Sequence, residues 1–299
     1  LLKQVRFIYD RQMRGEYISG LLRAIAPRMP VADFVREKLP AFVNAYDLMV
    51  RGSRAGLKLS ADTDRSLQLL GLINHEGWRA VAMQFLVERP ELDASADAFF
   101  KSLERLAFWL QYAVKDREYR QKRYRRVLDA MDALAKTGAS ALLEGESPLQ
   151  LSPEERQMLR DRLAGRFSNN KQRRSLLMRL EAACPGGRVL SVSADATVEH
   201  ILPQTPPKGS AWYADWTRPR DIEDLTESLG NYTLLTKAEN QEADTQGFAD
   251  KLAIFFRKGE CSYALTRDLR DLKAWTPDQV RARRDRMIGY LAADLQLDA

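Results

Sequence analysis

Apolar residues recur at three- and four-residue steps from residue 1 to about residue 180, which is the spacing of amphipathic helices. One such stripe consists of Phe99, Leu103, Leu106, Leu110 and Val114. A helix start is marked by Ser152 as the cap, with Pro153 at the first helical position and Glu155 at the capping-box position. Because no convincing strand-like alternation occurs in this part, the pattern predicts a helical domain over residues 1–185.

The pattern changes at the Pro-Gly-Gly sequence 185–187, which ends the helical periodicity. Residues 188–201 contain Val, Ile and Thr with partial period-two spacing, as in a short strand or hairpin. After a loop rich in Pro, Gly and Trp, residues 232–235 form a second strand-like segment that leads into a polar helix. The last helix is expected to begin after Thr276 as its cap. We therefore expect a second domain over residues 186–299, and a fold that is mainly α.

The length of 299 residues is typical of about two domains. Lys and Arg number 47 against 41 Asp and Glu, so the net charge of +6 fits a polyanionic partner, but also simple solubility. Two cysteines, Cys184 and Cys261, cannot make a four-cysteine zinc site or a disulfide framework, and we expect both to be inert in a reducing, cytoplasmic compartment. With no apolar run of about eighteen residues and no signal peptide, we expect no membrane association.

Two short motifs carry candidate chemistry. Residues 199–204 read Glu-His-Ile-Leu-Pro-Gln, and residues 229–236 read Leu-Gly-Asn-Tyr-Thr-Leu-Leu-Thr, with Asn240 nine residues after Asn231. Hydrolysis of a phosphodiester needs a base near neutral pKa, for which histidine is suited, and a cation that neutralises the developing charge. A carboxylate and an amide are oxygen ligands of the kind that a hard cation such as Mg²⁺ or Mn²⁺ prefers.

The two motifs together resemble the HNH, or His-Me finger, nucleases. They resemble more closely the C-terminal nuclease domain of GmrSD-like type IV restriction and phage-defence proteins. That domain has a similar acidic-His-Ile start, a Trp-containing loop, a Leu-Gly-Asn motif and a Phe-x-x-Lys motif, which lies within residues 247–252 here. The resemblance covers about residues 170–295. It implies a small ββα-metal nuclease domain with flanking helices after the helical domain.

Each motif residue receives a role from this resemblance. His200 is the general base, Glu199 and Asn240 are ligands of Mg²⁺ (or Mn²⁺), and Asn231 holds the loop that orients His200 without being a ligand. This sequence departs from many HNH motifs by having Glu at position 199 instead of Asp. The longer side chain changes the distance over which the carboxylate reaches the metal ion but keeps its charge. The third motif residue is Asn240 instead of His, which favours hard cations over zinc.

The function implied is a metal-dependent DNA endonuclease that nicks or cleaves DNA in bacterial defence against phage or foreign DNA. Because the chain begins with Leu1 instead of Met, we expect a missing N-terminal part, which in that family is an NTP-hydrolysing sensor domain; no Walker-type motif occurs here. Two alternatives stay open: a non-catalytic DNA-binding or regulatory module with a decayed HNH frame, and a ribonuclease. The sequence leaves the oligomeric state open.

Basic residues form two candidate DNA-contacting groups. Residues 115–126 contain seven basic and two acidic residues, a run that is either a solvated helix face or a clamp on phosphates. Its candidates are Arg120, Arg123 and Arg126. The second group precedes the first motif and consists of Lys171, Arg173 and Arg174; the last helix carries a similar basic run. For His75, Trp212 and Trp216, structural roles in packing are favoured over chemistry or base stacking.

Overall fold

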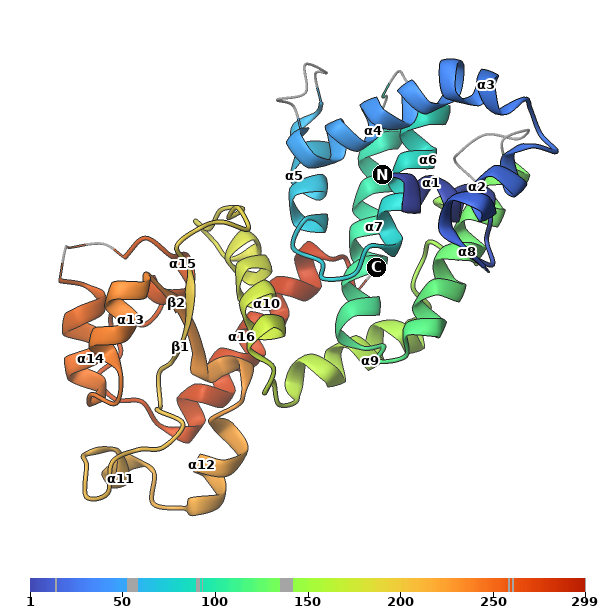
Figure 1. Cartoon of the computed structure of the whole chain (residues 1–299). Coiled ribbons are helices and arrows are strands. Elements are labelled where there is room, and N and C mark those ends of the chain that lie inside the picture. The colour runs from blue at the N-terminus through green and yellow to red at the C-terminus, as the bar shows by residue number, and fades with distance from the viewer. Residues whose placement is uncertain are drawn as a thin grey trace. The chain divides into compact units, whose positions relative to one another are not determined.

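The computed structural model describes residues 1–13, 15–52, 59–89, 92, 94–134, 142–257, 259 and 261–298. The chain divides into two compact units, Leu1–Glu155 and Arg156–Ala299 (Figure 1). Helices dominate both units, which agrees with the mainly α fold expected. No helix in the described ranges is long and apolar enough to cross a membrane.

The described residues of the first unit form helices joined by turns and loops, without a strand. Its elements are α1 (Leu2–Tyr9), α2 (Tyr17–Ile25), α3 (Val31–Asp33), the π-helical turn η1 (Phe34–Lys38), α4 (Leu39–Arg51), α5 (Ala61–Leu70), α6 (Gly77–Glu88), α7 (Ala94–Tyr112) and α8 (Arg117–Leu134). Four residues of the predicted stripe on α7 are fully buried, but the fifth, Val114, lies two residues beyond the helix end. Ser60 caps α5 by accepting a hydrogen bond from the Thr63 backbone N–H.

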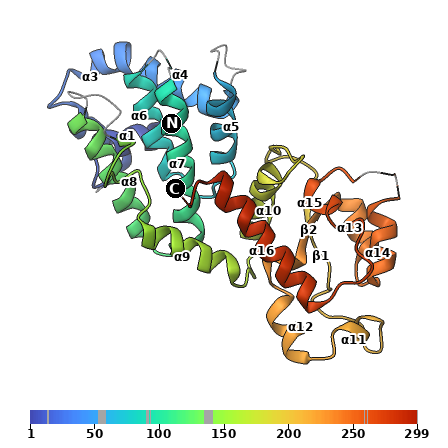
Figure 2. The ribbon, with the colours of Figure 1, turned by 180° about the vertical axis from the view of Figure 1, so that it is seen from behind.

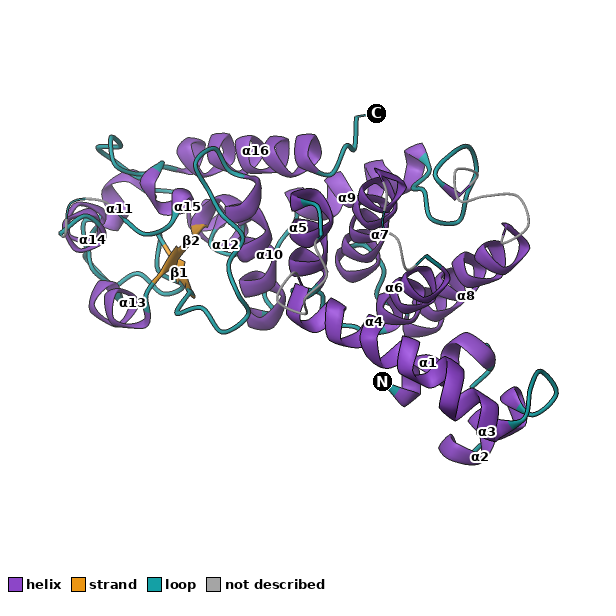
Figure 3. Ribbon diagram, turned by 90° about the horizontal axis from the view of Figure 1, so that it is seen from above, coloured by secondary structure: helices purple, strands orange, loops and turns teal. Residues whose placement is uncertain are grey.

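The second unit surrounds one two-stranded antiparallel sheet. Its elements are α9 (Pro153–Ala164), most of which lies in this unit, α10 (Asn170–Ala183), β1 (Thr197–His200), α11 (Trp212–Asp215), α12 (Pro219–Leu225), the 3-10 turn η4 (Leu229–Asn231), β2 (Tyr232–Leu235), α13 (Lys237–Ala243), α14 (Phe248–Phe255), α15 (Ala264–Arg267) and α16 (Pro277–Asp294). Both strands lie between α10 and α13 (Figure 3). The first strand is shorter than the segment 188–201 suggested, since only residues 197–200 pair with β2.

The division between the units falls at Glu155 and Arg156, whereas the sequence pattern placed it at residues 185 and 186. The reason is tertiary: α10 is helical like the first unit, but it packs against β1, β2 and α16 (Figure 2). Helical periodicity alone cannot say which core a helix joins. The helix caps predicted at Ser152 and Thr276 are confirmed. Ser152 and Glu155 exchange the reciprocal hydrogen bonds of a capping box, and Thr276 and Gln279 do the same.

Aromatic residues fill the core of the second unit. Trp212, Trp216 and Trp275 are 1–4% exposed and belong to one apolar cluster with residues of β2, α13, α14 and α16. The Trp216 indole N–H donates to the Trp275 carbonyl at 2.6 Å, so its polar edge is also satisfied. Trp212 and Trp216 therefore have the packing role that the sequence favoured. Both cysteines are free thiols, and burial raises the pKa of Cys184 to about 12.

Candidate functional site

The antiparallel pairing of β1 and β2 brings the two motifs together. Glu199 lies opposite Thr233 and His200 lies opposite Tyr232, at the point where β1 ends. The helix that follows β2, α13, begins with a capping box between Thr236 and Glu239. The Asn240 amide group of α13 donates back to the Val198 carbonyl at 2.9 Å, which fixes this helix against β1. Two strands and one helix thus surround the motif residues.

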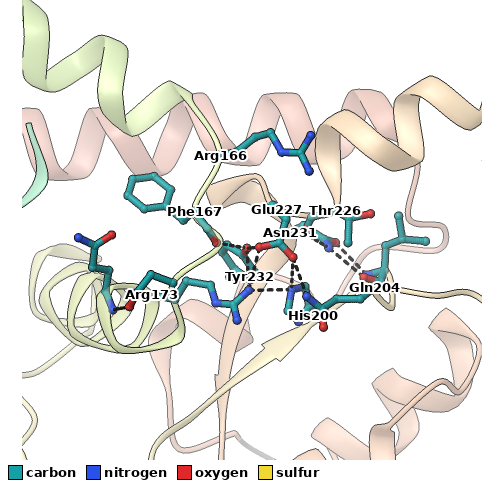
Figure 4. Close-up of polar contacts among 12 residues, drawn as sticks. Arg166, Phe167, Arg173, His200, Gln204, Thr226, Glu227, Asn231 and Tyr232 are labelled. Carbon is teal, nitrogen blue, oxygen red and sulfur yellow. Dashed lines mark hydrogen bonds and ion pairs between the residues drawn. The ribbon is translucent and has the colours of Figure 1, made fainter. Parts of the chain in front are cut away.

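His200 lies in a network of polar side chains (Figure 4). Its Nε2 atom is 3.3 Å from Glu227 Oε1 and 3.3 Å from a terminal guanidinium nitrogen of Arg173. The ring also packs edge-on against Tyr232, with ring centroids 4.9 Å apart. Burial, reinforced by the Arg173 charge and opposed by Glu227, lowers the pKa of His200 to about 4. The imidazole is therefore neutral near pH 7, as a general base must be.

Glu227 is the centre of this network, and the sequence motifs did not single it out. Its carboxylate accepts hydrogen bonds from Gln204 at 2.7 Å, Tyr232 at 2.9 Å and Arg173 at 2.9 Å. Burial favours the neutral acid, but these donors and the Arg173 charge outweigh it and lower the pKa of Glu227. The result is a charged, fixed carboxylate beside His200. A glutamate two residues before the Leu-Gly-Asn motif is the only local signal that the sequence contains.

Asn231 is completely buried and holds the loop that follows His200. Its side-chain oxygen accepts from the Leu202 backbone N–H at 2.8 Å and from the Trp275 indole at 3.0 Å. Its amide group donates to the carbonyls of Leu202 at 2.9 Å and Thr226 at 3.0 Å. Every polar atom of the Asn231 side chain is thereby occupied by protein groups.

Glu199 is buried and pairs with a lysine from α14. The ammonium group of Lys251, which is 0% exposed, bonds to Glu199 Oε1 and also donates to the His200 carbonyl at 2.8 Å. Burial raises the pKa of Glu199 and lowers that of Lys251, while their mutual attraction opposes both shifts. Lys251 is the lysine of the Phe-x-x-Lys motif, to which the sequence assigned no role. The structure makes it the partner of the expected metal ligand.

These groups border one cleft of about 510 Å³. Its lining comprises Glu199, His200, Pro203, Gln204, Thr205, Asn240, Gln241, Asp244 and Thr245. Carboxylates of Glu199 and Asp244 and the amide of Asn240 are donor types that suit Mg²⁺ or Mn²⁺. In the described part of the chain, no three His, Cys, Asp or Glu side chains are grouped so that they hold a metal alone. The oxygen atoms of Glu199, Asp244 and Asn240 are thus the candidate ligands at this cleft.

Two of the expected DNA-contacting arginines are committed to interior contacts. Arg123 is 8% exposed and bonds to Glu155 and to the carbonyls of Pro148 and Gln150. Arg173 is equally buried, between Glu227 and His200. The prediction that these two arginines contact DNA phosphates at the surface is therefore wrong. Arg123 forms a buried ion pair with Glu155, and Arg173 forms one with Glu227.

The other basic candidates differ in their exposure. Arg174 donates to the carbonyls of Val192, Ala194 and Ala196 and so holds the loop before β1. Arg120 is half-buried and bonds to the Val114 carbonyl, whereas Lys171 and Arg126 are exposed. In the last helix, Arg283 is 1% exposed and bonds to the carbonyls of Gly230 and Tyr232, which braces the turn that carries Asn231.

Part of the chain matches a known protein family. Residues 153–290 match the family model described as GmrSD restriction endonucleases, C-terminal domain. The matched range begins at the first residue of α9 and so nearly coincides with the second unit. A search of curated proteins and a search of solved structures each found no match.

Proposed function

Because residues 153–290 match the model of the C-terminal domain of GmrSD restriction endonucleases, we propose that the second unit is an HNH-type, Mg²⁺- or Mn²⁺-dependent DNA endonuclease. The observation that carries the proposal is the position of His200, whose Nε2 is 3.3 Å from the fixed carboxylate of Glu227 at the edge of the 510 Å³ cleft. We further propose that it acts in bacterial defence, in the cytoplasm, behind an N-terminal sensor domain.

His200 is the general base of this reaction. In the tautomer that the mechanism requires, Nε2–H donates to Glu227 and Nδ1 accepts the proton of a water molecule. The water oxygen attacks phosphorus, the bond between phosphorus and the leaving oxygen breaks, and solvent protonates that oxygen. Glu227 keeps the ring in this tautomer and orientation, which is the role of a carboxylate that backs a catalytic imidazole.

Glu199 and Asn240 would hold the metal ion, with Asp244 as a further oxygen donor at the rim of the cleft. When bound, the ion supplies positive charge to the phosphate and the leaving oxygen. Lys251 contributes a fixed positive charge behind Glu199, and its bond to the His200 carbonyl ties the metal-binding strand end to α14. Asn231 acts only through the loop that it holds.

The test is plasmid nicking by purified wild-type protein and His200→Ala, with Mg²⁺, with Mn²⁺ and with a chelator. Loss of a general base typically lowers the rate by about 10²–10⁴-fold. Glu227→Gln should lower the rate as well, and the exposed Glu223→Gln on α12 is its matched control. Nicking by His200→Ala at the wild-type rate would remove the base assignment.

Metal ligation is tested separately by Glu199→Gln and Asn240→Ala. Each should raise the metal concentration needed for half-maximal rate, because one oxygen ligand is weakened or lost. An unchanged metal titration in both variants would reject these ligands. Parallel DNA and RNA substrates distinguish the deoxyribonuclease from the ribonuclease alternative, and DNA binding without any cleavage would indicate the non-catalytic module.

A further inference from the structure

A second cavity, of about 500 Å³, lies in the first unit and has no part in the proposed nuclease site. Its walls come from α1 and the turn after it, from the start of α6, and from one face of α8. The lining residues are Lys3, Gln4, Phe7, Gln12, Met13, His75, Glu76, Gly77, Arg117, Arg120, Gln121 and Tyr124. This volume is in the range of about 300–1,000 Å³ that is typical of small-molecule sites.

The face of α8 follows from helical spacing. Arg117, Arg120, Gln121 and Tyr124 are separated by three, one and three residues, so they form one stripe along the helix. The Arg120 guanidinium is anchored by bonds to the carbonyls of Val114 at 2.6 Å and Lys115 at 3.1 Å. It is therefore a pre-oriented cation at the cavity wall. Burial lowers the pKa of His75 and raises that of Tyr124, and the Arg120 charge adds to the first shift and opposes the second.

Charge at this cavity favours an anion. Three cationic side chains line it, and the one carboxylate in the lining, Glu76, is already paired with Lys3 at 2.8 Å and with Arg79 at 3.4 Å. Two guanidinium groups, those of Arg117 and Arg120, thus face the cavity without a carboxylate partner among the described residues. Planar guanidinium groups are the side chains best suited to phosphate oxygens.

Two buried polar atoms at this cavity have no hydrogen-bond partner. These are the hydroxyl of Tyr124, a residue that is 1% exposed, and Nδ1 of His75, whose Nε2 is within hydrogen-bonding distance, 3.3 Å, of the Ala107 carbonyl. A buried polar group without a partner is unfavourable, and both atoms are covered by neighbouring protein atoms, so a bound polar molecule would satisfy either one only after its ring turns towards the cavity. The Phe7, His75 and Tyr124 rings and the amides of Gln4, Gln12 and Gln121 complete the lining.

From this lining we propose that the first unit binds a nucleoside monophosphate in this cavity. Arg117 and Arg120 take the phosphate, the aromatic rings contact the base, and the glutamine amides bond to its edge. A longer nucleic acid fits less well, because it needs a row of cations along an open surface. On α8 that row is interrupted: Tyr124 is buried and Arg123 is committed to Glu155.

Calorimetric titration of the purified protein with AMP, GMP, CMP and UMP tests the proposal. At least one should bind, and its Kd should rise about tenfold or more in Arg117→Gln, because a charge-assisted hydrogen bond is worth about 1.5–3 kcal/mol. Arg120→Gln should have a similar effect. Arg126→Gln removes the same charge from the same helix outside the cavity lining, so it should leave the Kd within about twofold.

Three further probes make the outcome decisive. Inorganic phosphate and the free nucleoside should each bind at least tenfold more weakly than the monophosphate, and the monophosphate should raise the melting temperature of wild type but not of Arg117→Gln. The proposal is overturned if no monophosphate binds, if phosphate alone binds as tightly, or if Arg126→Gln weakens binding as much as Arg117→Gln. Tighter binding of a single-stranded oligonucleotide through the same arginines would also overturn it.

Discussion

Replacement of Asn231 by alanine should destabilise the second unit far more than a typical surface substitution. The side chain is 0% exposed and makes four hydrogen bonds, to Leu202 twice, Thr226 and Trp275. In Asn231→Ala, the Leu202 N–H and the Trp275 indole N–H lose their acceptor, and two carbonyls lose their donor. The loop after β1 then keeps its other contacts, among them the bond from the Ile201 N–H to the Asn231 carbonyl at 2.9 Å and the bond from the Gln204 side chain to Glu227.

The expected loss follows from the number of groups left without partners. Each costs about 1–3 kcal/mol when it is buried, and the two donors cost the most because each has a single hydrogen to place. Water entering the vacated space satisfies some of the four groups, so we expect a loss of about 3–5 kcal/mol in the free energy of unfolding. Since domains are stable by only about 5–15 kcal/mol, the variant should fold but be marginal.

Urea unfolding followed by tryptophan fluorescence measures this loss, because three of the five tryptophans, Trp212, Trp216 and Trp275, lie in the second unit. Hydrogen exchange of residues 197–204 then shows whether the loop opens locally before the unit unfolds. The matched control is Asn44→Ala on an exposed position of α4, which should change stability by less than about 0.5 kcal/mol. A loss below about 1 kcal/mol with wild-type protection of residues 197–204 would refute the reasoning.

Two other predictions concern stability. Gly230→Ala should be strongly destabilising, because a Cβ there would lie 2.1 Å from the Val280 carbonyl oxygen. Gly289→Ala, where a Cβ on α16 would meet no other atom within 4 Å, should instead stabilise the protein by up to about 1 kcal/mol. Equal urea midpoints for the two variants would contradict this prediction. Burial and the nearby Arg120 lower the pKa of His75 to about 4, against about 6.5 unfolded, so the folded state binds fewer protons between those values. The free energy of unfolding should therefore fall from pH 6.5 towards pH 4, and His75 should account for up to about 3 kcal/mol of that loss. The loss should be smaller in His75→Asn. An identical pH dependence of the urea midpoints of wild type and His75→Asn would reject the lowered pKa of His75.

Local signals in the sequence predicted the mainly helical character of the chain, the second strand at residues 232–235 and the helix caps at Ser152 and Thr276. Ser152 and Thr276 were recognisable as caps because a capping box joins residues only three positions apart. The family resemblance carried by Glu199, His200, Asn231 and Asn240 implied two strands and a helix around one site, and the structure brings Glu199, His200 and Asn240 to one cleft. Such features depend on periodicity and on short-range hydrogen bonds, which a single sequence displays.

Only the tertiary structure decided which charges face each other. Glu227 is 27 residues from His200, and Lys251 is 52 residues from Glu199, so no local pattern pairs them. Arg123 and Arg173 looked like surface cations but became the buried partners of Glu155 and Glu227, because an arginine in the interior must have an anion beside it. The same holds for α10, whose periodicity predicted a helix but whose partners, the strands of the second unit, were decided by long-range packing.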